Sequence, residues 1–366
     1  MTILNTRDLV LDDWSVEKRN KNLYVWKKTI GRGRNAKAFL IPEEVHLNRG
    51  VVECIGLYLG DGKLTDNDLM HSQFHNKDFD LTKKIFKFFH SLGVKNSDIT
   101  FTLTYNKDGL AVAERNLSTI TRKFRIVKSE RNKFPTYSIQ VNGKIFRVFL
   151  KNFIMCSLNH IKNDTSLRKA FLCGYFAAEG WIGYSSKEKY LANVGFAYNP
   201  KTEEWLRDFC IECLKLEGVV SKINIRHEAH GGYIIIHNWE NYYKMWKLGI
   251  FDGCKRKRER FMKIFNGVKI CCEINKNMRL KLFTGDQNKL AKELDTYQAT
   301  ISNMKTGSKR NMWPTTKQIK KLSELNKVHL SEIKQNITHV RFGSLATLEA
   351  NSDILDDVFS RENLSF

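Results

Sequence analysis

The sequence has little proline, no long apolar run and too few acidic side chains to balance its basic ones. Only 4 of its 366 residues are proline and 42% are hydrophobic, which is typical of a packed globular protein and unlike a disordered chain. No stretch reaches the roughly 18 consecutive apolar residues of a membrane-spanning helix, and the N-terminal segment MTILNTRDLVLDD is too acidic for a signal peptide. We therefore expect an intracellular protein, in the cytoplasm, the nucleoid or an organelle, with no membrane partner.

The eight cysteines lack the spacing of a disulfide framework or a zinc ribbon. Cys210 and Cys213 form a CxxC pair, but they alternate with Leu206, Phe209 and Leu214 at the spacing of a buried helical face. Other cysteines could in principle join this pair around zinc, namely Cys254, Cys271 and Cys272. Because none of them has zinc-ribbon spacing, we expect no zinc.

Basic side chains are in large excess: 61 Lys and Arg stand against 39 Asp and Glu, a formal net charge of +22. Such an excess must be offset by a polyanion or tolerated as self-repulsion. Nucleic acid is the commonest polyanionic partner, and an anionic membrane surface is the alternative for which the sequence offers no segment. The charge therefore predicts a nucleic-acid-binding protein, with enough chain for two or three domains.

Two segments of the chain repeat the same short pattern. Residues 55–64 read IGLYLGDGKL and residues 171–182 read FLCGYFAAEGWI. Both predict an apolar helix with small residues four positions apart, followed by an acid and a glycine. The small residues are Gly56 and Gly60 in the first copy and Gly174 and Ala178 in the second, and the acids are Asp61 and Glu179.

The repeat continues beyond these two helices in the same order. HNKDFDLTKKIFKFFHSLGV (75–94) corresponds to YNPKTEEWLRDFCIECLKLEGV (198–219), and YSIQVNGKIFRVF (137–149) corresponds to YIIIHNWENYYKMW (233–246). Each half is predicted to run helix, strand pair, helix, strand pair, helix. We therefore expect an α+β fold of two pseudo-symmetric αββαββα halves, with basic β-hairpins in the extra length between Gly93 and Tyr137 of the first half.

The two apolar helices should bring their terminal acids together. Glycine in a helix costs about 1 kcal/mol relative to alanine, and close helix–helix packing is the usual compensation. Such packing would place Asp61 and Glu179 side by side, where two carboxylates repel unless a cation lies between them. A hard divalent cation such as Mg²⁺ fits oxygen ligands, and in a strongly basic chain a paired-acid metal site points to phosphodiester hydrolysis.

The pair GLYLGDG and GYFAAEG resembles the two LAGLIDADG motifs of single-chain homing endonucleases, over roughly residues 50–250. The resemblance implies that Asp61 and Glu179 are the metal-binding catalytic carboxylates. It also implies two four-stranded sheets that form a saddle over the DNA major groove, with cleavage of both strands across the minor groove. Catalytic candidates around the nucleophilic water are Asn76, Lys77 and Asn199; Pro200 replaces lysine in the second half, so the lysine's role cannot be symmetric.

The C-terminal part resembles a phage-repressor helix-turn-helix, on LAKELDTYQATISNMKTG (290–307) and the apolar pattern around it. Asp295 occupies the turn position where glycine is usual, and Asp tolerates a left-handed turn better than most residues. The recognition helix is expected at about Tyr297–Lys305. Its DNA-contacting residues would be Gln298, Ala299, Ser302 and Asn303 at base edges and Thr300 and Lys305 near phosphates.

The segment KRKRER (255–260) lies between the two predicted DNA-binding units and is expected to follow the phosphate backbone through Lys255, Arg256, Lys257 and Arg258. GRGRNAK (31–37) is a weaker candidate of the same kind. We expect the following division of the chain: a basic extension (1–50), the first half (51–158), the second half (159–250), a basic linker (251–280), a helix-turn-helix domain (281–338) and an acidic tail or terminal helix (339–366).

These patterns predict a metal-dependent endonuclease that cuts double-stranded DNA. Because the halves differ in length, one monomer should recognise a long, non-palindromic site. The same core also occurs in non-cleaving transcriptional regulators of Gram-positive sporulation and in maturases that help an intron RNA to fold. Retention of both acids argues against the regulator, and the helix-turn-helix argues mildly against RNA. An intein is disfavoured because the chain lacks an N-terminal nucleophile and a terminal His-Asn.

Overall fold

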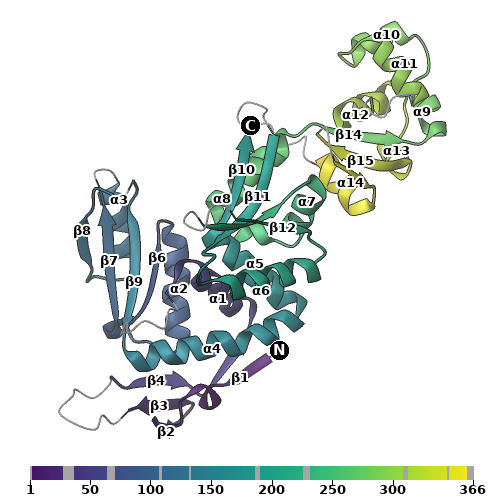
Figure 1. Cartoon of the computed structure of the whole chain (residues 1–366). Helices are drawn as coiled ribbons and strands as arrows, with labels where there is room; N and C mark the ends of the chain where they lie inside the picture. The colour runs from purple at the N-terminus through teal and green to yellow at the C-terminus, as the bar shows by residue number, and fades with distance from the viewer. Residues whose placement is uncertain are drawn as a thin grey trace. The chain divides into compact units, whose positions relative to one another are not determined.

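The computed structural model (Figure 1) describes the chain as two compact units. The first comprises residues 1–182, 194–236 and 244–258, and the second comprises residues 183–193, 237–243 and 259–366. Within the described part, no helix is long and apolar enough to span a membrane. The described residues are 2–27, 37–63, 71–106, 109–131, 133–185, 190–225, 231–307, 312–343 and 346–360.

Two buried helices, α1 (Arg49–Asp61) and α5 (Thr165–Glu179), pack on each other at the centre of the first unit. Each helix begins at a residue whose side chain accepts a backbone N–H three positions on: Asn48 from Val51 and Asp164 from Leu167, both at 3.0 Å. Nearly every α5 residue from Leu167 to Ala177 is buried. A helix that is apolar on all faces must be enclosed by other elements, and this accounts for its central position.

The first sheet has four strands in the order β6 (His71–Asn76), β9 (Thr136–Asn142), β7 (Ile99–Tyr105) and β8 (Arg125–Lys128). Helices α2 (Phe79–Ser91) and α4 (Lys144–Asn163) follow β6 and β9. Strand β8 runs parallel to β7, so the expected hairpin is not formed there. Parallel neighbours need a crossover connection, and α3 (Leu110–Ser118) lies in it, with Ala113 and Leu117 buried.

The second sheet has the order β10 (Gly180–Ser185), β11 (Tyr190–Tyr198), β13 (Gly232–Ile236) and β12 (Ser221–Ile225). Helix α6 (Glu204–Leu216) follows β11, and α7 (Trp239–Lys247) follows β13. Strands β11, β13 and β12 repeat the chain order of β6, β9 and β7 across their sheet. Together the two sheets and their helices give the mixed α+β fold that the sequence predicted.

The described part of the expected basic extension (1–50) forms β-strands. Strand β1 (Thr2–Asn5) pairs with β5 (Glu44–Leu47). A separate three-stranded sheet is formed by β2 (Ser15–Arg19), β3 (Asn22–Trp26) and β4 (Phe39–Pro42). Buried Thr6, in the short helix η1 (Thr6–Leu9), donates a 2.6 Å hydrogen bond from Oγ1 to the Pro42 carbonyl. The basic segment 31–37 lies outside the described residues except for Lys37.

The second unit has a three-stranded sheet in the order β14 (Ile270–Ile274), β15 (Ile337–Phe342) and β16 (Ala346–Glu349). Its helices are α9 (Lys276–Leu282), α10 (Gln287–Glu293), α11 (Gln298–Thr306), α12 (Thr316–Leu325), α13 (Leu330–Gln335) and α14 (Ser352–Ser360). The expected linker 251–280 therefore contains η3 (Ile250–Gly253), α8 (Lys255–Gly267), β14 and the start of α9, and the expected tail contains β16 and α14. Strand β14 of the expected linker pairs with β15, a contact between distant parts of the sequence that local charge alone could not indicate.

Candidate active site at the ends of α1 and α5

Small residues let the backbones of α1 and α5 touch. A Cβ added at Gly56 would overlap the carbonyl oxygen of Phe171, and one at Gly174 would overlap that of Glu53. At the C-terminal end, a Cβ on Gly60 would overlap Ala178 and come within 3.1 Å of Glu179 Cγ. The structure thus brings the two helix ends, and the acids that terminate them, to one place.

Both acids are half-buried, and burial shifts the pKa of each one. Burial raises the pKa of Asp61 to about 6. Burial also raises the pKa of Glu179 to about 7, with further increases from the negative charges of Asp61 and Glu203. Near neutral pH the pair therefore holds its negative charge at a cost that a nearby cation would remove.

Asn76 is the closest partner of Asp61. Its Nδ2 donates a 2.6 Å hydrogen bond to Asp61 Oδ2, and its Oδ1 accepts the backbone N–H of Asp78 at 2.7 Å. The chain after α1 turns back onto β6, where Lys63 N donates to the Gln73 carbonyl at 3.0 Å. This return explains why an asparagine at the end of β6 reaches the end of α1.

Lys77, next to Asn76, is exposed, and its Nζ lies 5.8 Å from the centre of the Phe134 ring. Its positive charge lowers the pKa of Asp61, although less than Asn76 and Lys257 do. Lys77 also lines a hollow of about 440 Å³ with Asp78, Tyr137 and Arg256. The structure places Lys77 beside the site without a direct bond to either acid among the described contacts.

Asn199 occupies a different arrangement from Asn76. Its backbone N–H donates to Glu203 Oε2 at 2.7 Å, and its side-chain Oδ1 accepts the Lys201 N–H at 3.0 Å. Asn199 therefore closes the turn between β11 and α6. It nevertheless shares with Glu179 a hollow of about 470 Å³, lined by Glu179, Ala197, Tyr198, Asn199, Pro200, Lys201, Glu203 and Gly231.

Lys257 is the residue at this site whose position the sequence did not predict. It is only 8% exposed, and its Nζ donates hydrogen bonds of 2.7–2.8 Å to the carbonyls of Phe176, Ala177 and Ala178 at the end of α5. Burial lowers its pKa to about 8, partly offset by the charge of Asp61 and Glu179. The expected phosphate contact is therefore wrong for Lys257, because its ammonium group is already bound to a helix C-terminus.

A signal for this burial was present in the sequence. Lys257, Phe261, Ile264 and Phe265 recur at the spacing of one helix face, and all four are buried. The neighbouring basic residues point elsewhere: Arg256 lies 3.2 Å from Asp78 Oδ2, and Arg258 lies 3.3 Å from Asp252 Oδ1. Lys255, Arg256 and Arg258 are exposed, so these three side chains are accessible to a phosphate group.

The donor set of the site fits a hard divalent cation better than a soft one. Asp61 and Glu179 offer carboxylate oxygens, and Asn76 is already committed to Asp61. Across the described residues, no group of three or more His, Cys, Asp and Glu side chains forms a metal-binding cluster. A cation held by the two acids would therefore leave coordination positions for water and for oxygens of a bound phosphodiester.

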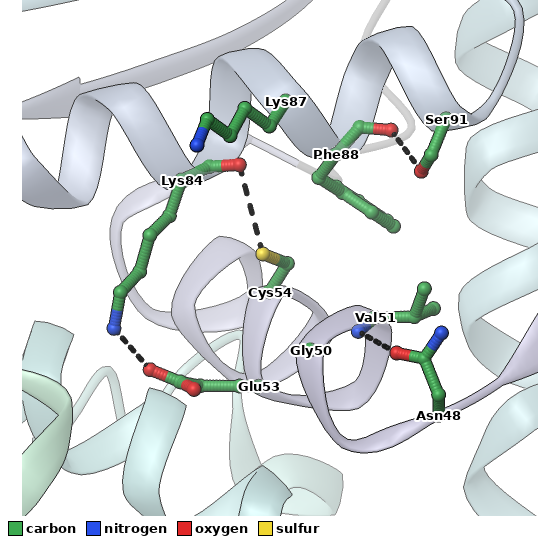
Figure 2. A pocket seen from close by; sticks show the side chains of 9 residues that line it. All are labelled: Asn48, Gly50, Val51, Glu53, Cys54, Lys84, Lys87, Phe88 and Ser91. Atoms are coloured by element: carbon green, nitrogen blue, oxygen red, sulfur yellow. Dashed lines mark hydrogen bonds and ion pairs between the residues drawn. The ribbon is translucent and has the colours of Figure 1, made fainter.

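A second pocket lies at the opposite end of α1 (Figure 2). It encloses about 310 Å³ between α1 and α2, and Lys84 there forms an ion pair with Glu53. Glu53 and Asp61 are eight residues apart in one helix, which corresponds to about 12 Å. This pocket, lined mainly by apolar surface, is therefore separate from the acids.

In the second unit, α10 and α11 are joined by a short turn in which Asp295 has a φ of +49°. Ile301 and Met304 of α11 are buried, whereas Gln298 and Ala299 are exposed. The other four candidate contact residues are half-buried or exposed only in part: Thr300, Ser302, Asn303 and Lys305. The start of α11 therefore presents its side chains to solvent, while the middle of the helix packs inward.

Comparisons with known proteins identify one family model and several solved structures. No curated protein sequence matches the chain. Similar solved structures include I-DmoI in complex with DNA and Mn (TM-score 0.31, 16% identity, covering 55% of this chain and 97% of that one). Others are the homing endonuclease I-WcaI bound to its DNA recognition sequence (0.35, 17%, 56% and 82%) and the N-terminal LAGLIDADG domain of DUF199/WhiA (0.37, 14%, 59% and 88%). Residues 166–260, which include Glu179 and Lys257, match the family model of the LAGLIDADG-like domain, and this part of the chain is therefore similar to that domain.

Proposed function

We propose that the protein is a site-specific endonuclease that cuts double-stranded DNA, in the manner of homing endonucleases, with Asp61 and Glu179 as its metal-binding carboxylates. The observation that carries the proposal is the convergence of two half-buried acids, one from each motif helix, at a contact made possible by Gly56, Gly60 and Gly174. Placing two carboxylates together away from water costs free energy. A divalent cation that both acids bind for catalysis would offset that cost.

Each residue of the site has a role that its contacts support. Asp61 and Glu179 would hold the divalent metal, for which Mg²⁺ is the expected ion. Asn76 fixes the orientation of the Asp61 carboxylate by its 2.6 Å hydrogen bond. Lys257 holds the last carbonyls of α5 and so the backbone from which Glu179 projects. A bound Mg²⁺ would lower the pKa of a water molecule and offset charge on the phosphate under attack.

Lys77 and Asn199 have less direct roles in the proposal. Lys77 is exposed beside Asp61, where its ammonium group can approach the negative charge of a bound phosphate. Asn199 shapes the wall of the hollow that Glu179 faces. The unequal surroundings of the two acids mean that the two halves would contribute differently to cleavage.

The DNA surface is proposed to comprise the open faces of the two sheets, the exposed basic residues of α8 and the start of α11. The net charge of +22 supports a polyanionic partner. In this proposal the two halves are pseudo-symmetric, one monomer binds a long non-palindromic site, and α10 and α11 act as a helix-turn-helix with α11 in a major groove. Retention of both acids favours this function over a non-cleaving regulator or an RNA maturase on the same core.

The proposal is tested by incubating the purified full-length protein with a randomised plasmid library and Mg²⁺, then sequencing the cut ends. Double-strand breaks at one family of long, related sequences are expected. Samples in Ca²⁺ would show whether DNA is bound when cutting is slow, because Ca²⁺ is larger and less exacting in geometry. Binding with no breaks in Mg²⁺ or Mn²⁺ would favour the regulator, and preference for structured intron RNA over duplex DNA would favour the maturase.

A further inference from the structure

The two sheets present chemically different open faces, although their strand orders correspond. In the first sheet, the side that faces the helices carries Phe74, Phe101 and Ile139, all buried. The other side carries the residues that alternate with them. Almost every one of these is polar: His71, Gln73 and His75 on β6, Thr136, Ser138, Gln140 and Asn142 on β9, and Thr100, Thr102 and Thr104 on β7.

Hydrogen bonds already order part of this polar face. Gln140 Nε2 donates to Asn142 Oδ1 at 2.5 Å, and Asn142 Nδ2 donates to Thr100 Oγ1 at 3.3 Å. Burial and nearby positive charges lower the pKa of His75, which favours the neutral imidazole, a group that can both donate and accept a hydrogen bond. Gln73 lies directly opposite Gln140. The face is therefore a set of fixed donors and acceptors of the kind that reads base edges.

The corresponding face of the second sheet is mainly aromatic and aliphatic, although Asn193 of β11 also lies on it. Tyr233 lies opposite Ala197, and both are half-buried; Ile235, which is only 9% exposed, lies opposite Gly195. The indole of Trp181 covers Gly195, where an added Cβ would come within 2.9 Å of Nε1, and it meets the Tyr233 ring edge to face at 6.2 Å. Among the described residues of β12, only Lys222 and Asn224 add polar groups to this face, and they lie at its outer edge.

We propose that the two sheets read their halves of the DNA target by different chemistries: the first specifies bases through hydrogen bonds, and the second contacts thymine methyl groups through its apolar face. This inference rests on the proposed function, because it requires duplex DNA against both open faces. Thymine is the base that presents a methyl group in the major groove. The target therefore has one stringent half and one thymine-rich, permissive half.

The physical reason for the difference is the penalty for a wrong base. A fixed amide or imidazole left without its partner loses hydrogen bonds, which lowers affinity roughly 10-fold or more for each mismatch. An apolar surface that loses one methyl contact gives up about a 4-fold factor, the value of one buried CH₂. A methyl contact also leaves no donor or acceptor of the protein without its partner when the base is substituted, so several sequences would be accepted in that half.

The test is selection of bound duplexes from a randomised library by the full-length protein in Ca²⁺, a readout that does not require cleavage. Gln140→Leu, which keeps the size of the side chain, should flatten base preference only in the stringent half. Tyr233→Ala should alter only the other half. Replacing thymine with uracil in the permissive half should weaken binding about 4-fold per methyl removed, whereas the same replacement in the stringent half should have a smaller effect. Thermal unfolding of each variant would verify that it is folded. If Gln140→Leu is unstable, Gln73→Leu provides a second variant of the polar face.

The outcomes separate the inference from the function on which it rests. Enrichment of a site with equally strong base preference in both halves would overturn the inference and leave the proposed function intact. The same holds if uracil has no effect in the half that Tyr233→Ala alters. Failure to enrich any duplex would overturn the proposed function and the inference together.

Discussion

Asn76 donates a 2.6 Å hydrogen bond to Asp61, whereas Asn199, its counterpart in the second half, uses its side-chain oxygen to accept the N–H of Lys201. The two asparagines occupy matching sequence positions, yet only one is bonded to its motif acid. The first acid is therefore held by a side-chain amide, and the second depends on the backbone at the end of α5.

This difference predicts unequal effects of removing the two amides. Asn76→Ala should reduce cleavage about 10-fold, since a hydrogen bond to a charged group is worth about 1.5–3 kcal/mol. Because Asn76 lowers the pKa of Asp61, its loss should raise that pKa and move the acid limb of the pH–rate profile to higher pH. Asn199→Ala is the matched control and should leave the acid limb unchanged. Equal shifts in the two variants would contradict the assignment.

Lys257 should be far more important for stability than its basic neighbours. Lys257→Met removes the donor from three carbonyls in a buried position and should lower the free energy of unfolding by about 2–4 kcal/mol. Arg258→Met, at the next position of α8 and exposed, should change it by less than about 0.5 kcal/mol. Chemical denaturation of both variants would measure this. Equal stability of the two would show that the buried ammonium group does not hold the α5 end.

The buried acids predict an unusual dependence of stability on pH in the absence of metal. The folded-state pKa values of Asp61 and Glu179 are raised, to about 6 and about 7, so the folded protein binds more protons than the unfolded chain between roughly pH 4 and 7. Stability should therefore fall as pH rises through this window, by roughly 5 kcal/mol for the two acids together. Added Mg²⁺ should reduce the loss at pH 7. Denaturation curves in EDTA at pH 5 and 7.5 that show no pH effect beyond that of Asp61→Asn would argue against the buried pair.

Features of the fold and the site could be predicted where the pattern lies within one helix or strand, and not where they depend on contacts between distant segments. The apolar segments with Gly56, Gly60 and Gly174 predicted two buried helices, because small residues four positions apart in an apolar helix indicate close packing against another helix. The parallel strand β8 could not be predicted, since pairing with β7 across α3 is a long-range contact. Because five of six residues in its segment are basic, the sequence predicts a phosphate contact for Lys257, and the run of charge masks the helical spacing that Lys257 shares with Phe261. The catalytic roles of the acids stay predictions.

Point variants test the α11 proposal better than truncation does. Removing residues from 281 onward would take away β15, which pairs with β14, and so disrupt the sheet as well as α11. Gln298→Ala should relax base preference at one or two positions, by about 1–3 kcal/mol if the amide contacts adenine. Lys305→Ala should weaken binding to all sequences alike and make the fall of log affinity with log salt less steep. Identical selection profiles for wild type and Gln298→Ala would exclude a base-reading role for this residue.

The central claim is that Asp61 and Glu179 together form the catalytic metal site. Its most direct test compares wild type, Asp61→Asn and Glu179→Gln on one cleavable DNA target in Mg²⁺, because both substitutions keep size and shape while removing a charge. Each variant should lose nearly all double-strand cleavage and keep its DNA affinity or bind slightly more tightly, since a carboxylate repels phosphates until a cation is bound. If either variant cuts both strands at the wild-type rate, that carboxylate is not catalytic and the account is wrong.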